Sequence, residues 1–135
     1  VPFIASWPDK IKPGSVSDQT ICHNDLIATC AELIDEKLPD NAGEDSFSIL
    51  PVLLGKTTQP IREATIHQSL TRDVSIRLGP WKLIVFQKGK PALYDLAKDI
   101  GETQNIADQH PEVVEKLSAL LNRYVIEGRS TPGAR

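Results

Sequence analysis

The chain has 135 residues, of which 40% are apolar and 24% charged, and its formal net charge at pH 7 is −3. This balance is typical of a single folded domain, not of a disordered chain, and no apolar run approaches the roughly 18 residues of a transmembrane helix. Lysines and arginines are scattered among acidic residues instead of forming a basic stripe, which argues against nucleic-acid binding.

The first residues of the chain combine a strand pattern with a loop pattern. Residues 1–7 are apolar apart from Ser6, which predicts a buried β-strand, and the prolines, glycine and serines of 8–18 predict a surface loop. A lone buried strand needs neighbours on both sides to pair its backbone groups. The sequence also lacks methionine and a signal-peptide pattern. We therefore expect Val1 to be an internal residue, and this chain to be the back portion of a longer polypeptide.

A helix is predicted over 23–39. Asn24 is a suitable N-cap, Asp25 adds a favourable negative charge to the first turn, and the proline at the end closes the segment. A polar loop then leads to one or two buried helical turns within 46–55. Five apolar positions recur at helical spacing in the first of these segments, namely Leu26, Ile27, Cys30, Leu33 and Ile34.

Four strands are predicted next, because the spacing of apolar residues changes from helical to alternating. Apolar residues at 74, 76 and 78 alternate with polar ones, which predicts that one face of the sheet is buried and the other is exposed to solvent. The connections are too short for a parallel crossover, so the strands form an antiparallel meander. The strands are predicted over 62–70, 73–79, 81–87 and 91–96, with reversals at Gly79-Pro80 and 88–91.

The last third of the chain is predicted to be helical after an irregular, turn-rich link over 97–109. Residues 110–128 carry Pro111 at the first helical position and Gly128 after the last turn. Their apolar face packs on the meander in two layers. The expected fold is therefore α+β, a four-stranded antiparallel meander packed against a C-terminal helix, preceded by a strand-loop-helix from the edge of a larger α/β body. No partner can be identified for the tail, 129–135.

The two cysteines are predicted to be free thiols. Cys22 and Cys30 lie eight positions apart, so on a helix their Cα atoms are about 12 Å apart, beyond disulfide reach. The three histidines do not fall at zinc-ligand spacing with them, so no structural zinc site is expected.

Six stretches in this order resemble the C-terminal end of the sulfatase family, within the alkaline-phosphatase-like superfamily of metal-dependent hydrolases. They are VPFIASWPDKIKPGSVSD, HNDLIATCAELI, SFSILPVLLG, IRLGPWKLIV, LYDLAKDIGETQNIADQHPEVVEKL and GRSTPG. The resemblance implies that residues 1–60 are the C-terminal remnant of an α/β catalytic domain. It implies that residues 61–135 are a C-terminal α+β subdomain, and that the chain packs on the N-terminal catalytic domain.

The resemblance also implies an arylsulfatase-like sulfuric ester hydrolase as the full-length parent, a kind of protein that is commonly exported or lysosomal. Family members use a formylglycine made within a C/S-x-P/A-x-R motif and a calcium ion held by aspartates and an amide side chain. Neither Cys22 nor Cys30 begins that motif, and Asn24-Asp25 matches the family's helix-opening stretch. We therefore predict no catalytic residue and no metal ligand here, and expect the chain to be inactive alone.

One candidate for substrate binding remains. The family often carries a histidine at the position of His67, facing the part of the pocket that holds the non-sulfate part of the substrate, and Gln68 follows it here. An imidazole could bond a ring hydroxyl, or a sulfate oxygen when protonated. A histidine that only pins strands together is the competing interpretation. Arg72 and Arg77 are weaker candidates, since an arginine on a strand is more often solvated.

Three functions therefore stand as hypotheses. The first is the C-terminal part of a sulfatase acting on a sulfate ester. The second is a fragment of a phosphonate or phosphodiester hydrolase of the same superfamily, because the motifs that separate the two classes lie upstream. The third is a stand-alone binding or interaction module, against which the lone N-terminal strand argues.

Overall fold

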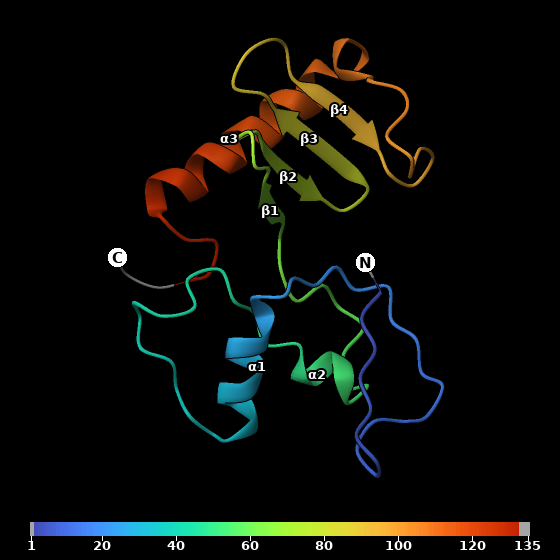
Figure 1. Ribbon diagram of the computed structural model, residues 1–135, viewed down its shortest axis with the longest axis vertical. Coiled ribbons are helices and arrows are strands. Elements are labelled where there is room, and N and C mark those ends of the chain that lie inside the picture. Colours follow the sequence, from blue (N-terminus) through green and yellow to red (C-terminus); the bar gives the residue numbers. More distant parts are fainter. Residues whose placement is uncertain (1, 133–135) are drawn as a thin grey trace. The chain divides into compact units, whose positions relative to one another are not determined.

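The structure is a computed structural model that describes residues 2–132. The described residues fall into two compact units, one made of the chain up to Arg62 together with the segment from Thr131 on, the other of Glu63–Ser130. Within residues 2–132, no helix combines the length and apolar content that a membrane crossing requires. The elements are α1 (Asp25–Leu33), α2 (Leu50–Leu53), β1 (Thr65–Gln68), β2 (Val74–Leu78), β3 (Trp81–Val85), β4 (Ala92–Asp95), the 3₁₀ turn η1 (Ala107–Gln109) and α3 (Pro111–Glu127) (Figure 1).

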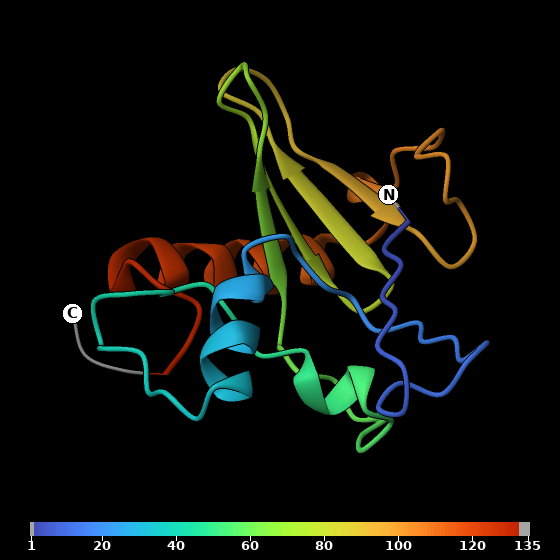
Figure 2. The same cartoon turned by 60° about the horizontal axis from the view of Figure 1, so that its bottom comes forward.

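The second unit is the predicted antiparallel meander with its helix. The sheet order is β1-β2-β3-β4 and every neighbouring pair is antiparallel. Figure 2 shows α3 running across one face of the twisted strands. The α+β prediction for this part of the chain is confirmed, and the four strands lie within the predicted segments.

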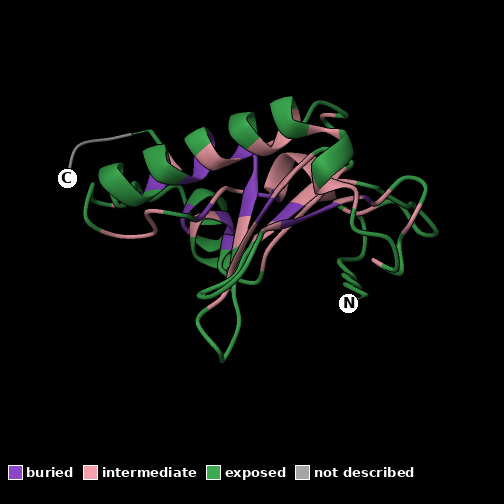
Figure 3. Cartoon of the chain, turned by 90° about the horizontal axis from the view of Figure 1, so that it is seen from above, coloured by how far each residue is buried: buried purple, intermediate pink, exposed green. Residues whose placement is uncertain are grey.

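The core of this unit lies between the sheet and α3. Ile76, Leu83 and Leu93 are cross-strand neighbours on one face of the sheet, and each is 0% exposed. Leu117 of α3 is also 0% exposed and belongs to the same cluster. In Figure 3 the outward side of α3 is exposed, and buried residues lie on its side toward the strands. Full burial of one such aliphatic side chain contributes about 1.5–3 kcal/mol, so these four residues carry much of the unit's stability.

The predicted ends of α3 are also confirmed. Pro111 occupies the first helical position, and Gly128 ends the helix in the left-handed region with φ 68°. Proline is tolerated at this first position because the amide it lacks would have no partner inside the helix. Glycine adopts positive φ without steric cost, which favours it at the C-terminal cap.

The link over 97–109 is ordered by its own polar side chains. The Asp99 carboxylate accepts hydrogen bonds from the amides of Thr103 and Gln104 at 2.8 and 2.9 Å, and these bonds lower the pKa of Asp99. Asn105 Oδ1 accepts from the amide of Leu93 at 3.0 Å, and Asn105 Nδ2 donates to the carbonyl of Pro91 at 3.3 Å. The link therefore bonds to the β4 edge and completes part of its hydrogen bonding.

Residues 2–7 are not paired as a strand within the described part of the chain, and Ile4 is 91% exposed. The predicted strand required neighbours that this chain was not expected to supply, so its place in a larger sheet stays a prediction. One prediction for the first unit is wrong. The first helix ends at Leu33, well before Pro39. Asp35, with φ 58°, ends the helix. Its amide donates to the carbonyl of Glu32, and the amide of Glu36 donates to the carbonyl of Ala31. Aspartate tolerates this left-handed conformation better than most residues.

Tyr124 makes the stability of the second unit depend on pH in the alkaline range. Its hydroxyl donates to Glu63 Oε2 at 2.8 Å, and burial together with this bond raises the pKa of Tyr124 from 10.0 to about 12. Because the folded state favours the neutral phenol, its stabilising effect is complete below pH 10 and is lost as the pH rises through 12. We expect the difference in unfolding free energy between wild type and Tyr124→Phe to be constant below pH 10 and to shrink above it, measured by urea unfolding at several pH values. A difference that stays constant up to pH 12 would contradict this assignment.

Candidate functional site

Two groups of polar side chains are candidates for function. The first is a buried cluster in the first unit, formed by Cys22, Asp25, Phe47 and Arg62. The second is the face of the sheet that carries His67. We call the first the Asp25–Arg62 cluster and the second the polar face of the sheet.

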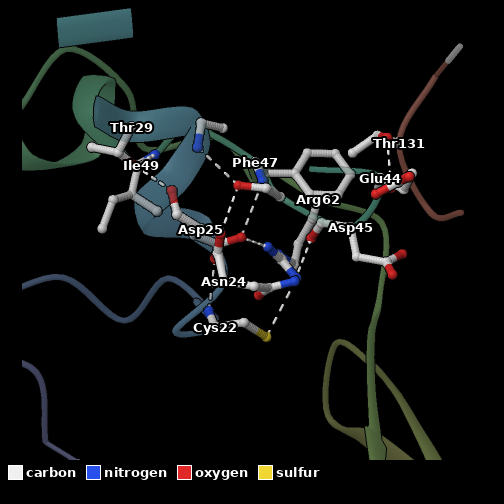
Figure 4. Close-up of polar contacts among 12 residues, drawn as sticks. Cys22, Asn24, Asp25, Thr29, Glu44, Asp45, Phe47, Ile49, Arg62 and Thr131 are labelled. Atoms are coloured by element: carbon white, nitrogen blue, oxygen red, sulfur yellow. Dashed lines mark hydrogen bonds and ion pairs between the residues drawn. The ribbon is translucent and has the colours of Figure 1, made fainter. Parts of the chain in front are cut away.

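The Asp25 carboxylate is the centre of the first cluster and is 0% exposed. Its Oδ2 accepts from the amide of Cys22 at 2.7 Å, and its Oδ1 accepts from the amide of Phe47 at 3.0 Å. Arg62 completes the set through an ion pair with Oδ1 (Figure 4). One carboxylate thus joins three segments that lie far apart in the sequence.

Arg62 is held as tightly as its partner, since its side chain is only 5% exposed. Its guanidinium carbon lies 4.8 Å from the centre of the Phe47 ring, within cation–π distance, and Nη1 donates to Cys22 Sγ at 3.4 Å. Burial raises the pKa of the Cys22 thiol, and the positive charge of Arg62 only partly offsets the rise. Cys22 is therefore a protonated hydrogen-bond acceptor at neutral pH and is poorly suited to act as a nucleophile.

Hydroxyl groups extend this cluster along α1. Thr29 Oγ1 donates to the carbonyl of Asp25 at 2.6 Å and accepts from the amide of Ile49 at 3.0 Å. Ser46 Oγ donates to the carbonyl of Asn24 at 2.7 Å and accepts from the amide of Ala28 at 3.0 Å. Side-chain bonds therefore fasten the segment from Ser46 to Ile49 against the polar side of α1.

Two expectations for this region are corrected by the structure. Asn24 lies at the N-cap position but makes no side-chain cap bond to α1; its Nδ2 donates to the carbonyl of Asp45 at 2.9 Å. The tail has a partner, since the amide and hydroxyl of Thr131 both donate to the carbonyl of Glu44, at 3.0 and 2.6 Å. Residues 133–135 of the tail lie outside the described residues. Neither contact is visible as a sequence motif, because each joins a side chain or amide to a distant backbone carbonyl.

The cluster is not built to hold a metal ion. Two amides and a guanidinium already engage the Asp25 carboxylate, and the Arg62 charge beside it opposes a second cation. Across residues 2–132, no three histidine, cysteine, aspartate or glutamate side chains converge on one point. The chemistry available to this cluster is structural.

The predicted substrate residues lie at the end of β1, which is an edge strand. His67 and Gln68 are both exposed and pair with Ser75 and Val74 of β2. Consecutive residues on a strand point to opposite faces, so the two side chains do not share a face. A ligand could touch both side chains by crossing the edge of β1 that faces away from β2.

The strand register places His67 on one face with five polar residues, namely Thr65, Ser75, Arg77, Lys82 and Tyr94, and with the apolar Ile84 and Ala92. The cations of this face are engaged locally. Lys82 Nζ binds both carboxylate oxygens of Glu102 at 2.6 and 2.8 Å, and Arg77 Nε donates to the carbonyl of Gly79 at 3.1 Å. Arg72 lies in the β1–β2 turn with φ 66°, away from this register.

Sequence reasoning missed Arg62, the buried cation of the site. It lies 37 positions from Asp25, and no periodic pattern connects the two. The one available signal was a single charge at the start of a predicted strand, which is equally typical of a solvated residue.

The ion pair leads to a stability prediction. Arg62→Met leaves the Asp25 charge buried without a counter-ion, which costs about 3–5 kcal/mol of unfolding free energy. Asp25→Asn combined with Arg62→Met removes both charges, and we expect it to recover part of that loss in urea unfolding. The control is Arg123→Met, because Arg123 also pairs with a carboxylate, that of Glu63, but at an exposed site. Equal effects of Arg62→Met and Arg123→Met would show that burial of the pair has no energetic role.

Comparisons with known proteins give a consistent result. A family model described as N-sulphoglucosamine sulphohydrolase, C-terminal, matches residues 1–127. The chain is 37% identical to an N-acetylgalactosamine-6-O-sulfatase of Bacteroides thetaiotaomicron and 31% identical to human arylsulfatase A. These alignments cover 90% and 88% of this chain, but only 26% and 29% of the two relatives. The chain thus spans little more than a quarter of the curated relatives it matches.

Solved structures agree with the sequence comparisons. A glycosaminoglycan-metabolism sulfatase of Bacteroides thetaiotaomicron superposes with a TM-score of 0.77 at 35% identity, over 87% of this chain and 27% of that one. A phosphonate monoester hydrolase of Agrobacterium radiobacter superposes with a TM-score of 0.56 at 22% identity, over 73% of this chain and 23% of that one. The second likeness is one of fold alone.

Proposed function

The chain belongs to the sulfatase family, and from that membership we propose that it is the C-terminal portion of a sulfuric ester hydrolase. The observation that carries the proposal is the family match over residues 1–127, which is to a C-terminal domain. The share of the relatives that the chain covers, 26% and 29%, supports the same assignment. Hydrolysis of the sulfate ester is then the activity of the whole protein, to which this chain contributes part of the scaffold and of the substrate pocket.

We propose that the nucleophile and the metal ligands of that enzyme lie upstream of this chain. The family's formylglycine arises in a C/S-x-P/A-x-R motif that neither Cys22 nor Cys30 begins. The residues present also do not suit calcium, because the Asp25 carboxylate is already engaged by two amides and by Arg62. No step of the reaction is therefore assigned to a metal in this chain.

His67 is the residue we propose to contact the substrate. It lies exposed at the end of an edge strand, beside the Ser75 hydroxyl position on β2. A neutral imidazole both donates and accepts a hydrogen bond, which suits a sugar hydroxyl, and a protonated one suits a sulfate oxygen. Gln68 would contribute from the opposite face, to a ligand that crosses the edge of β1.

The proposed substrate is a sulfated carbohydrate. Its support is the name of the relative at 37% identity, an N-acetylgalactosamine-6-O-sulfatase. The alternative, a phosphonate or phosphodiester hydrolase, rests on the fold likeness to the phosphonate monoester hydrolase at 22% identity. The higher identity to sulfatases favours a sulfate ester over a phosphonate.

The proposed activity is tested on the full reading frame that encodes this chain. We expect the full-length protein, supplied with calcium, to hydrolyse an aryl sulfate or 6-O-sulfated N-acetylgalactosamine, and the 135-residue chain to match a buffer blank. Turnover by the 135-residue chain alone would place the nucleophile within it. Faster turnover of a phosphonate monoester than of any sulfate ester would favour the alternative.

The role of His67 is tested in the same full-length protein. His67→Ala should lower kcat/KM for a sulfated sugar about 10–100-fold, because one hydrogen bond to the substrate is lost, while a small aryl sulfate that does not reach β1 is hydrolysed as before. The matched control is Ser69→Ala in the adjoining turn, since the Ser69 hydroxyl bonds to Thr71 and Asp73 of that turn. Unchanged kinetics of His67→Ala on every sulfated sugar would remove this residue from the site.

A further inference from the structure

Two connections at one end of the sheet are joined by a glutamine. Residues 69–73 link β1 to β2 and residues 86–91 link β3 to β4, so both lie where β1 and β3 end (Figure 2). The amide of Gln87 donates to Asp73 Oδ1 at 3.0 Å, and its Nε2 donates to the carbonyl of Arg72 at 2.8 Å. The two connections are therefore held side by side.

These connections bring three cations together. Arg72, Lys88 and Lys90 are all exposed, and across residues 2–132 none of them forms an ion pair with a carboxylate. The acidic residue of the two connections is Asp73, whose carboxylate accepts from the Thr71 hydroxyl at 2.6 Å and from a backbone amide. These bonds lower the pKa of Asp73. We call Arg72, Lys88 and Lys90 the basic cluster.

The basic cluster differs in charge from the rest of its unit. The whole chain has a formal net charge of −3, and carboxylates neutralise other cations within Glu63–Ser130. Three ion pairs do so, namely Lys82–Glu102, Lys98–Asp95 and Arg123–Glu63. Like charges gathered on one exposed surface repel each other and attract anions. The basic cluster is therefore available to an anionic ligand.

The surroundings of the basic cluster suit a carbohydrate. His67, proposed above to contact the substrate, lies two positions before the first connection, which is about 7 Å along a strand. Phe86 begins the second connection and is 38% exposed, so part of its ring is open to the apolar CH groups of a sugar. An aromatic ring beside three cations fits a charged sugar chain better than a lone inorganic anion.

We propose that the basic cluster binds the sulfate groups of a polymeric sulfated carbohydrate, on sugars that neighbour the one whose ester is hydrolysed. This inference rests on the proposed function and extends it from a sulfated sugar to a sulfated chain. The solved sulfatase at 35% identity belongs to the metabolism of glycosaminoglycans, which carry anionic groups at regular intervals along a chain. Arg72 offers a planar fork that bonds two oxygens of one sulfate, and Lys88 and Lys90 act as point charges.

The test is a titration of the full-length protein with a fluorescently labelled chondroitin 6-sulfate oligosaccharide, followed by fluorescence anisotropy. EDTA is present to stop hydrolysis, and mass spectrometry of the recovered oligosaccharide checks that its sulfates remain. We expect Arg72→Gln with Lys88→Gln and Lys90→Gln to weaken binding about tenfold at low salt, because three exposed charge contacts are lost. The difference should shrink at high salt, since exposed charges are screened. An affinity within about twofold of wild type overturns the inference.

Two further triple variants separate the basic cluster from net charge and from folding. Arg123→Gln with Lys98→Gln and Lys116→Gln also removes one arginine and two lysines from exposed positions of the same unit, and it should bind as wild type does. A loss equal to that of the first triple variant overturns the inference, because net charge alone then explains it. Exchanging arginine for lysine and lysine for arginine within the basic cluster keeps all three charges and should retain the affinity. A loss in this variant as large as in the first also overturns the inference.

Two other polyanions test the identity of the ligand. Unsulfated chondroitin of the same length keeps the carboxylates and lacks the sulfates, and we expect it to bind at least about fivefold more weakly. A single-stranded DNA with the same number of charges is the competing ligand, although three cations supply fewer contacts than the roughly 6–10 phosphate contacts of a DNA-binding protein. Equal binding of unsulfated chondroitin, or tighter binding of the DNA, overturns the inference.

Failure of this inference and failure of the proposed function give different results. Binding that depends on the basic cluster, without turnover of any sulfate ester, supports the binding site and rejects the proposed activity. Turnover of a sulfate ester with unchanged binding in the first triple variant supports the activity and rejects the site. Titration and hydrolysis are measured separately, so neither result depends on the other.

Discussion

The buried pair of Asp25 and Arg62 is the interaction on which the first unit depends. Few apolar side chains are fully buried there, and Ile49 is the largest of them. One carboxylate instead fixes the start of α1, the segment before α2 and the end of the unit at Arg62. Two charges removed from water are costly unless each finds several partners. Here backbone amides, a thiol and an aromatic ring supply them, and that set of partners determines where these segments lie.

The second unit is organised by a different kind of interaction. Its strands are neighbours in sequence and in space, and its core is a layer of aliphatic residues between the sheet and α3. The long link before α3 is held by Asp99 and Asn105, whose side chains satisfy backbone groups that no strand or helix would satisfy. In this unit a long connection is thus held in place by polar side chains.

The polar anchoring of α1 also explains why its apolar side is exposed. A helix held by its hydrophobic side has no apolar surface left to offer. Because Asp25 and Thr29 hold α1 through hydrogen bonds, Leu26, Leu33 and their neighbours remain exposed. The buried charge pair of the first unit and the exposed apolar side of α1 are therefore two consequences of one arrangement.

Sequence alone determined the elements whose pattern is local. The alternation at 74–78 and in the neighbouring strands, the short reversals, and the helix between Pro111 and Gly128 all appear in the structure as predicted. The family resemblance also came from the order of local motifs. Periodicity and turn chemistry act between residues a few positions apart, which is why they can be read without a structure.

The tertiary structure alone decided the features that join distant residues. It showed that Asp25 pairs with Arg62, that Thr131 bonds to Glu44, that residues 2–7 are not a strand within this chain, and that α1 buries its polar side. It also separated the predicted pair at 67 and 68 onto opposite faces of β1. Burial and long-range pairing depend on which surfaces meet in space, and neither hydrophobic spacing nor a motif specifies which side of a helix will find a partner.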